Sequence, residues 1–113
     1  DFLGPTPSQT TMALLARAQV SVMPSLLESF GIPYFEALAL GVPSVGADVP
    51  CAREALGEAG RFAQPDSGES WAECVNEILT DRDLFVNQSL ARHHGRPTWS
   101  EVAARYLQML REL

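Results

Sequence analysis

A β-loop-α-β pattern in the first half of the chain constrains its fold more than any other feature. The β-branched run from Gln19 to Met23 predicts a short buried strand. Pro33 suits the first position of a helix, because its missing N–H would have no partner there, and Gly41 is typical of a helix end. A second apolar strand is predicted from Pro43 to Gly46. Parallel strands joined through a helix are nearly always right-handed crossovers, so the pattern indicates an open α/β sheet.

The rest of the chain predicts a helix-rich continuation of that sheet. Asp1–Gly4 is expected to be a strand end, and Ser8 can cap a first helix. Thr98 and Glu101 have the spacing of a capping box at the start of the last helix. The fold class is therefore a partial Rossmann-like, doubly wound α/β domain with three or four short parallel strands. The further predicted elements are a short helix at Arg53–Gly57, a weak strand at Arg61–Ala63, and helices at Glu69–Leu79 (with Trp71, Val75, Ile78 and Leu79 inward), Asp81–His94 and Thr98–Leu113.

Two carboxylates eight positions apart, Glu28 and Glu36, flank a turn that contains Gly31. The backbone N–H groups at such a helix start are unpaired and can hold a phosphate, while an ionised carboxylate can accept hydrogen bonds from a vicinal diol. A sugar nucleotide carries hydroxyls on both sides of its phosphates, so the pattern favours that kind of ligand. The helix dipole alone also favours an acid near a helix N-terminus, and a structural role for either carboxylate therefore stays open.

These residues resemble the signature of a known family. Residues 24–37 read Pro-Ser-x-x-Glu-Ser-Phe-Gly-Ile-Pro-x-x-Glu-Ala, and Leu-Gly-Val-Pro-Ser-Val follows from Leu40. The run is similar to the Glu-x7-Glu signature in the C-terminal, donor-binding domain of the large group 1 family of retaining glycosyltransferases, which have the GT-B fold. Further similarity lies in Phe2-Leu3-Gly4, in residues 53–60 and in Thr98-Trp99-Ser100, so the resemblance covers nearly the whole chain.

The resemblance implies roles for individual residues. Glu28 would be the residue important for catalysis: it would accept hydrogen bonds from the donor sugar and fix its ring relative to the bond that breaks, without acting as a general base. Glu36 would hold the ribose hydroxyls. Main-chain amides of the intervening turn would contact the sugar and the β-phosphate, with the side chains of Phe30 and Ile32 packing. The implied donor-binding residues are Glu28, Ser29, Phe30, Gly31, Ile32 and Glu36.

The implied reaction is transfer of a sugar from a nucleotide-diphosphate sugar to an acceptor hydroxyl with retained anomeric configuration, with no cofactor and no metal. The chain is expected to be one partial nucleotide-sugar-binding domain, residues 1–113, cut from a longer enzyme. The family's basic pair for the pyrophosphate and its acceptor-binding domain both lie upstream of the matched residues. We therefore expect residues 98–113 to dock on that missing domain, and the isolated chain to show no turnover.

Composition excludes several other classes. Eight Arg, no Lys and fourteen acids give a net charge of −6, which argues against nucleic acid as a partner. No apolar run is long enough to span a bilayer, and Cys51 and Cys74 are expected to be reduced thiols in a cytoplasmic protein. The adjacent His93 and His94 point in different directions on a helix and should not chelate a metal together. An exposed sheet edge makes self-association plausible.

Two alternatives to the leading prediction remain open. A sugar-nucleotide epimerase would share the fold but is expected to lack the Glu28–Glu36 spacing. A non-catalytic or assembly domain of the same fold would have no physical need for either carboxylate.

Overall fold

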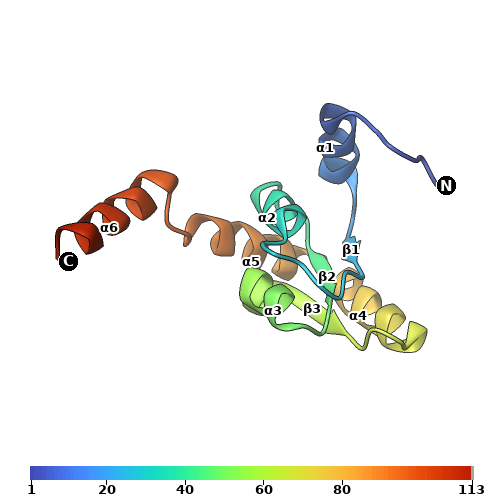
Figure 1. Ribbon diagram of the computed structural model, residues 1–113. Helices are drawn as coiled ribbons and strands as arrows, with labels where there is room; N and C mark the ends of the chain where they lie inside the picture. Colours follow the sequence, from blue (N-terminus) through green and yellow to red (C-terminus); the bar gives the residue numbers. More distant parts are fainter. Residues whose placement is uncertain (113) are drawn as a thin grey trace.

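The computed structural model describes residues 1–112 and contains a three-stranded parallel sheet with helices on both faces (Figure 1). The strands are β1 (Ser21–Met23), β2 (Ser44–Ala47) and β3 (Gly60–Ala63), in the spatial order β1-β2-β3. Val45 in the central strand lies opposite Val22 on one side and Arg61 on the other. The predicted partial Rossmann-like α/β fold is thus confirmed.

Six α-helices and one short 3-10 helix connect and cover these strands within residues 1–112. The helix α2 joins β1 to β2, and α3 with η1 joins β2 to β3, so each connection is a β-α-β unit of parallel strands. The bounds are α1 (Ser8–Arg17), α2 (Ile32–Ala39), α3 (Pro50–Leu56), η1 (Gly57–Ala59), α4 (Gly68–Thr80), α5 (Arg82–His94) and α6 (Trp99–Arg111).

The sheet separates two apolar clusters, because successive side chains of a strand point to opposite faces. One cluster joins α2 and α3 to the sheet and is centred on Tyr34, Leu38 and Leu56. The other contains Val45 of the central strand and Ile78 of α4, together with further buried residues of β3 and α5. Helices therefore cover both faces of the sheet, as a doubly wound arrangement requires.

The first and last helices lie outside this core. Neither α1 nor α6 contains a buried residue. In Figure 1, α6 projects away from the sheet and ends at the point farthest from α4, which gives the molecule its elongated dimensions of 50 × 29 × 27 Å. The predicted capping box of α6 is present: Thr98 Oγ1 accepts from the Glu101 N–H, and the Thr98 N–H donates to the Glu101 carboxylate at 2.7 Å.

Several sequence-based expectations need correction. Asp1–Gly4 forms no strand in the structure, because a strand needs a hydrogen-bonded neighbour and nothing among residues 1–112 pairs with it. The helix expected at Arg53–Gly57 begins earlier, at Pro50, whose fixed φ suits a first helical position. Leu79, expected to face inward, is exposed. Leu113, expected on the apolar side of the last helix, lies outside the described residues.

Within residues 1–112, each helix is too short or too polar to cross a lipid bilayer.

Candidate functional site

The loop between β1 and α2, residues 24–31, leaves the carboxyl edge of the sheet, where open α/β domains bind ligands. We call it the signature loop. It ends at Gly31, which caps α2 with φ of +70°, a conformation that costs any residue with a Cβ free energy. A Cβ at Gly31 would also lie only 2.7 Å from the Tyr34 ring. Glycine is therefore required both for the turn and for its close contact with α2.

The end of the signature loop carries free backbone donors. Among the hydrogen bonds of residues 1–112, none is donated by the N–H groups of Ser29, Phe30, Gly31 or Ile32. Consecutive amides before a helix form a concave donor surface that suits an anion or a hydroxyl-rich ligand. Within residues 1–112 these N–H groups have no protein acceptor, and their role as donors to a ligand stays a prediction.

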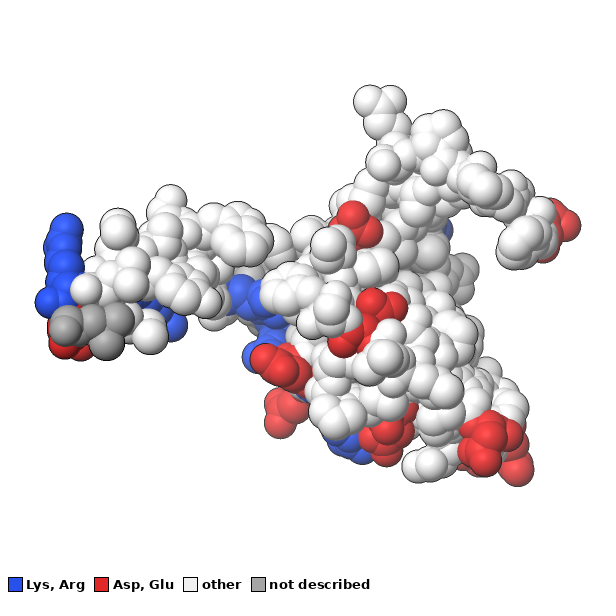
Figure 2. All heavy atoms as spheres, viewed as in Figure 1, with Lys and Arg blue, Asp and Glu red and all other residues white. Residues whose placement is uncertain are grey.

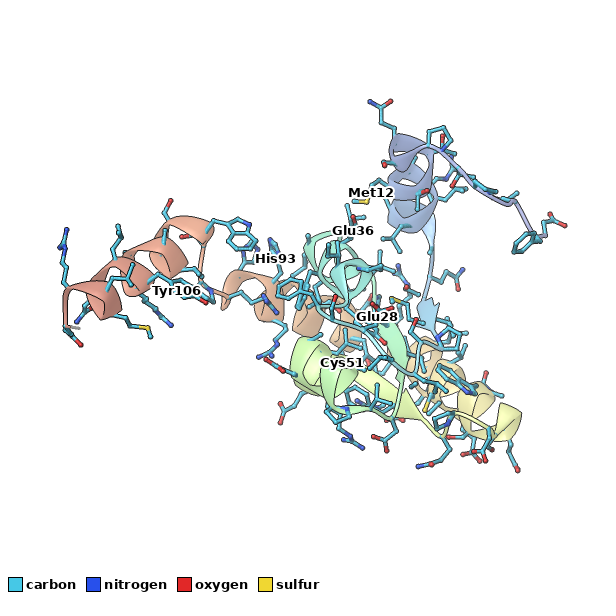
Figure 3. All side chains as sticks on the ribbon, viewed as in Figure 1. Met12, Glu28, Glu36, Cys51, His93 and Tyr106 are labelled. Atoms are coloured by element: carbon cyan, nitrogen blue, oxygen red, sulfur yellow. The ribbon has the colours of Figure 1, made fainter. Side chains whose placement is uncertain are left out.

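Glu28 and Glu36 are both half-buried. Neither carboxylate takes part in a hydrogen bond or in either of the two ion pairs among residues 1–112, although the Glu36 backbone carbonyl accepts from the Leu40 N–H. Figure 3 shows Glu28 in the signature loop, in front of the sheet, and Glu36 on α2. The cavity beside the loop is lined by Ser29 and Phe30 but by neither carboxylate. The structure therefore leaves both acids available without enclosing them in that cavity.

Tyr34 is a residue of this site that the sequence did not single out. Its side chain is fully buried, and its hydroxyl donates to the Met23 carbonyl at the end of β1 at 3.4 Å. The ring lies so close to β2 that a Cβ at Gly46 would be 2.9 Å from the hydroxyl oxygen. Burial raises the pKa of Tyr34, and the nearby Cys51 and Glu28 raise it further. Tyr34 lies three positions after Gly31, about one helical turn away, and this spacing is the feature of the sequence that could have identified Tyr34 as part of the site.

A second unpredicted feature lies at the end of β2, where Asp48 forms a bidentate ion pair with Arg53 of α3. The Nε–Oδ1 distance is 2.5 Å and the Nη2–Oδ2 distance 2.8 Å. The hydrogen bond from Arg53 lowers the pKa of Asp48, and the guanidinium also lies over the Phe62 ring, 4.7 Å from its centroid. Nothing in the local pattern marks this pair, because it depends on how the strand enters the helix.

The structure also corrects the expected packing around the loop. Phe30 contacts Phe35, with ring centroids 4.9 Å apart, and so packs as expected although half of it is exposed. Ile32 instead is exposed, because the helix turns that position toward solvent. Trp99 on α6 is 81% exposed.

Figure 2 shows acidic side chains spread over the viewed face of the sheet-containing part, with basic side chains fewer. Among residues 1–112 there is no group of three or more His, Cys, Asp or Glu side chains placed to hold a metal ion. The chemistry that these residues offer is hydrogen bonding through main-chain amides and carboxylates.

A comparison with protein families agrees with this geometry. A family model described as "Glycosyl transferases group 1" matches residues 1–92, which is most of the chain. The chain belongs to this family. The expected group 1 resemblance is thereby confirmed.

Individual relatives of this group 1 chain are glycosyltransferases by name. It is 28% identical to a D-inositol 3-phosphate glycosyltransferase of Corynebacterium urealyticum, over 99% of the chain and 27% of that protein. It is 33% identical to the O-antigen chain mannosyltransferase B of Escherichia coli, over 80% of the chain and 25% of that protein. A phosphatidyl-myo-inositol mannosyltransferase of Mycolicibacterium smegmatis is 34% identical over 96% of the chain and 29% of that protein. The chain thus spans about a quarter of the length of these relatives.

Proposed function

We propose that this chain is the donor-binding part of a retaining glycosyltransferase that uses a nucleotide-diphosphate sugar. The proposal rests on the amides from Ser29 to Ile32, which donate no hydrogen bond within residues 1–112. In the sequence they lie between the carboxylates of Glu28 and Glu36, which have no ion-pair partner among those residues. Free amides suit phosphate oxygens, and free carboxylates suit hydroxyls. Membership of the group 1 family supports the same ligand class.

The proposed roles assign different parts of the donor to the signature loop and to α2. Glu36, on the first turns of α2, accepts from the ribose hydroxyls, and the amides of Phe30 and Gly31 donate to the β-phosphate. Glu28 accepts from the hydroxyls of the transferred sugar and orients its ring. Gly31 lets the backbone approach the ligand closely because no Cβ intervenes.

In the proposed reaction the sugar passes to an acceptor hydroxyl on the same face from which the diphosphate leaves, so the anomeric configuration is retained. The departing diphosphate assists removal of the acceptor proton. The chain contributes orientation and charge stabilisation, and we assign neither carboxylate as a general base. We propose that no metal or other cofactor takes part. Because the named relatives include mannosyltransferases, a hexosyl donor is the first to test.

The acceptor is proposed to be recognised outside these residues, since the chain spans about a quarter of its relatives. We also propose that α6 is the docking element for that further part. Its apolar residues Tyr106, Met109 and Leu110 are all more than 60% exposed, and one helix without a buried face is marginal in water by itself.

The test is calorimetric titration of the purified chain with nucleoside diphosphates of different bases, each compared with its monophosphate and its hexose conjugate. Diphosphates should bind more tightly than monophosphates. Replacing Glu36 by Ala should weaken diphosphate binding about tenfold or more, because a hydrogen bond to a charged group contributes about 1.5–3 kcal/mol. Glu28→Ala should leave the affinity for the diphosphate unchanged and weaken only the binding of the hexose conjugate.

The matched control is Glu69→Ala, which removes an exposed carboxylate from the first turn of α4. It should bind every ligand as the parent does. If the Glu28 and Glu36 variants also behave like the parent, the assignment of these carboxylates to the donor is wrong.

A further inference from the structure

Arg96, in the segment between α5 and α6, lies directly against the aromatic pair of the candidate site. Its guanidinium carbon is 3.7 Å from the centroid of the Phe35 ring, and Phe35 contacts Phe30 of the signature loop. The geometry forms a continuous stack from the linker before α6, through α2, to the loop that carries the free amides.

Two cavities meet at this stack. The smaller, of about 120 Å³, lies between the signature loop and α3 and is lined by Ser29, Phe30, Cys51 and Arg96, among others. The larger, of about 410 Å³, lies between the loop and α6 and includes Trp99 and Tyr106. Phe30 and Arg96 line both cavities, which therefore adjoin at these two residues.

The guanidinium of Arg96 has no other strong partner. Within residues 1–112 it takes part in no ion pair and donates no hydrogen bond, although Glu54 lines the same small cavity. By contrast, the neighbouring Arg92 donates to the carbonyls of Glu54 and Ala55 and so closes the end of α3. The Arg96 backbone N–H donates to the His93 carbonyl, and the contact that places the Arg96 side chain is its stacking on the Phe35 ring.

We propose that Arg96 is a positioning residue for the signature loop. Its cation stacks on Phe35, Phe35 holds the Phe30 ring, and the Phe30 ring keeps the amides of Ser29 to Gly31 in a fixed orientation. The N–H groups of the signature loop donate no hydrogen bond within residues 1–112, whereas the Gly31 carbonyl at its end accepts from the Tyr34 N–H at 2.9 Å. Removing the stack releases the loop without disturbing the sheet.

The first experiment measures backbone order parameters of the chain by ¹⁵N relaxation, without any ligand. Arg96→Met keeps a long unbranched side chain and removes the charge. In this variant the order parameters of Phe30 and Gly31 should fall from about 0.85, typical of rigid backbone, to below about 0.6. Arg96→Lys keeps a cation over the ring, so its order parameters at Phe30 and Gly31 should stay close to those of the parent.

Arg61→Met is the matched control. The Arg61 guanidinium lies over the Phe85 ring, 4.4 Å from its centroid, but belongs to the opposite face of the sheet. Its replacement should remove a stack of the same kind and leave the order parameters of the signature loop as in the parent. Melting temperatures of all variants report any general loss of stability.

The second readout rests on the proposed function. Arg96→Met should bind nucleoside diphosphate about three- to tenfold more weakly than the parent, because part of the binding free energy is then used to order the loop. Unchanged loop order in Arg96→Met, equal loop motion in Arg61→Met, or failure of Arg96→Lys to restore order would each overturn the positioning role. If the loop responds as proposed but the parent binds no nucleotide, the proposed function fails and the positioning role stands.

Discussion

Gly31 illustrates, at the scale of a single residue, why the site tolerates little change. Its backbone is left-handed, and a Cβ added there would lie 2.7 Å from the Tyr34 ring. Gly31→Ala should therefore lower the free energy of unfolding by about 1–2 kcal/mol for the backbone conformation alone, with more from the clash. Urea denaturation of the parent and the variant measures this loss in the free energy of unfolding. The matched control is Gly68→Ala, because a Cβ at Gly68 meets nothing within 4 Å, and a loss as large there would contradict the account.

Tyr34 predicts a specific dependence of stability on alkaline pH. Burial raises its folded-state pKa above 10.0, so at high pH the folded chain keeps a proton that the unfolded chain loses. The contribution of the protonated Tyr34 hydroxyl to the free energy of unfolding is complete below pH 10. It is lost as the pH rises above that value, through the raised folded-state pKa. Denaturation at several pH values should show less alkaline loss in Tyr34→Phe than in the parent. Tyr106→Phe, which alters the exposed tyrosine of α6, should keep the parent's profile.

At the scale of elements, α6 depends on its cap because it has no buried face. The hydrogen bond from the Thr98 N–H lowers the pKa of Glu101 below 4.5. The capping box therefore stabilises the helix fully above pH 4.5, and this stabilisation is lost as the pH falls through the lowered folded-state pKa of Glu101. Thr98→Ala should cost α6 about 0.5–2 kcal/mol of helix stability. Circular dichroism should show reduced helicity with an unchanged melting midpoint of the core, whereas Ser100→Ala should leave the helicity intact. A core midpoint that falls with Thr98→Ala would contradict the peripheral role of α6.

The elements themselves were largely predictable from the sequence, whereas their contacts were not. Pro33 and Gly41 bracket α2 to within two residues, because capping chemistry is local. The Asp48–Arg53 ion pair was missed because it depends on how β2 enters α3. The stack of Arg96 on Phe35 was missed because it depends on how the segment after α5 packs against α2. The spacing of Glu28 and Glu36 predicts a ligand site, and that role stays a prediction. The exposure of Ile32 could not be predicted, because it depends on the exact residue at which the helix begins.

At the scale of the whole molecule, β1 is an outer strand whose second edge is unpaired within residues 1–112. Val22 on this strand is 49% exposed. Such an edge can pair with another chain, so the purified chain is expected to self-associate as its concentration rises. Sedimentation velocity measures this self-association. Val22→Lys should shift the distribution of sedimenting species toward the monomer. A parent that stays monomeric at high concentration would exclude association through this edge.

We propose that a nucleotide-diphosphate sugar binds to the amides of the signature loop and to the carboxylates of Glu28 in that loop and Glu36 on α2. The most direct measurement is a ¹H–¹⁵N spectrum of the chain during titration with a nucleotide-diphosphate hexose. The account predicts saturable shifts confined to residues 28–36 and the adjoining end of β2, with the largest at Phe30, Gly31 and Ile32. Shifts centred elsewhere, or none at millimolar ligand, would contradict it.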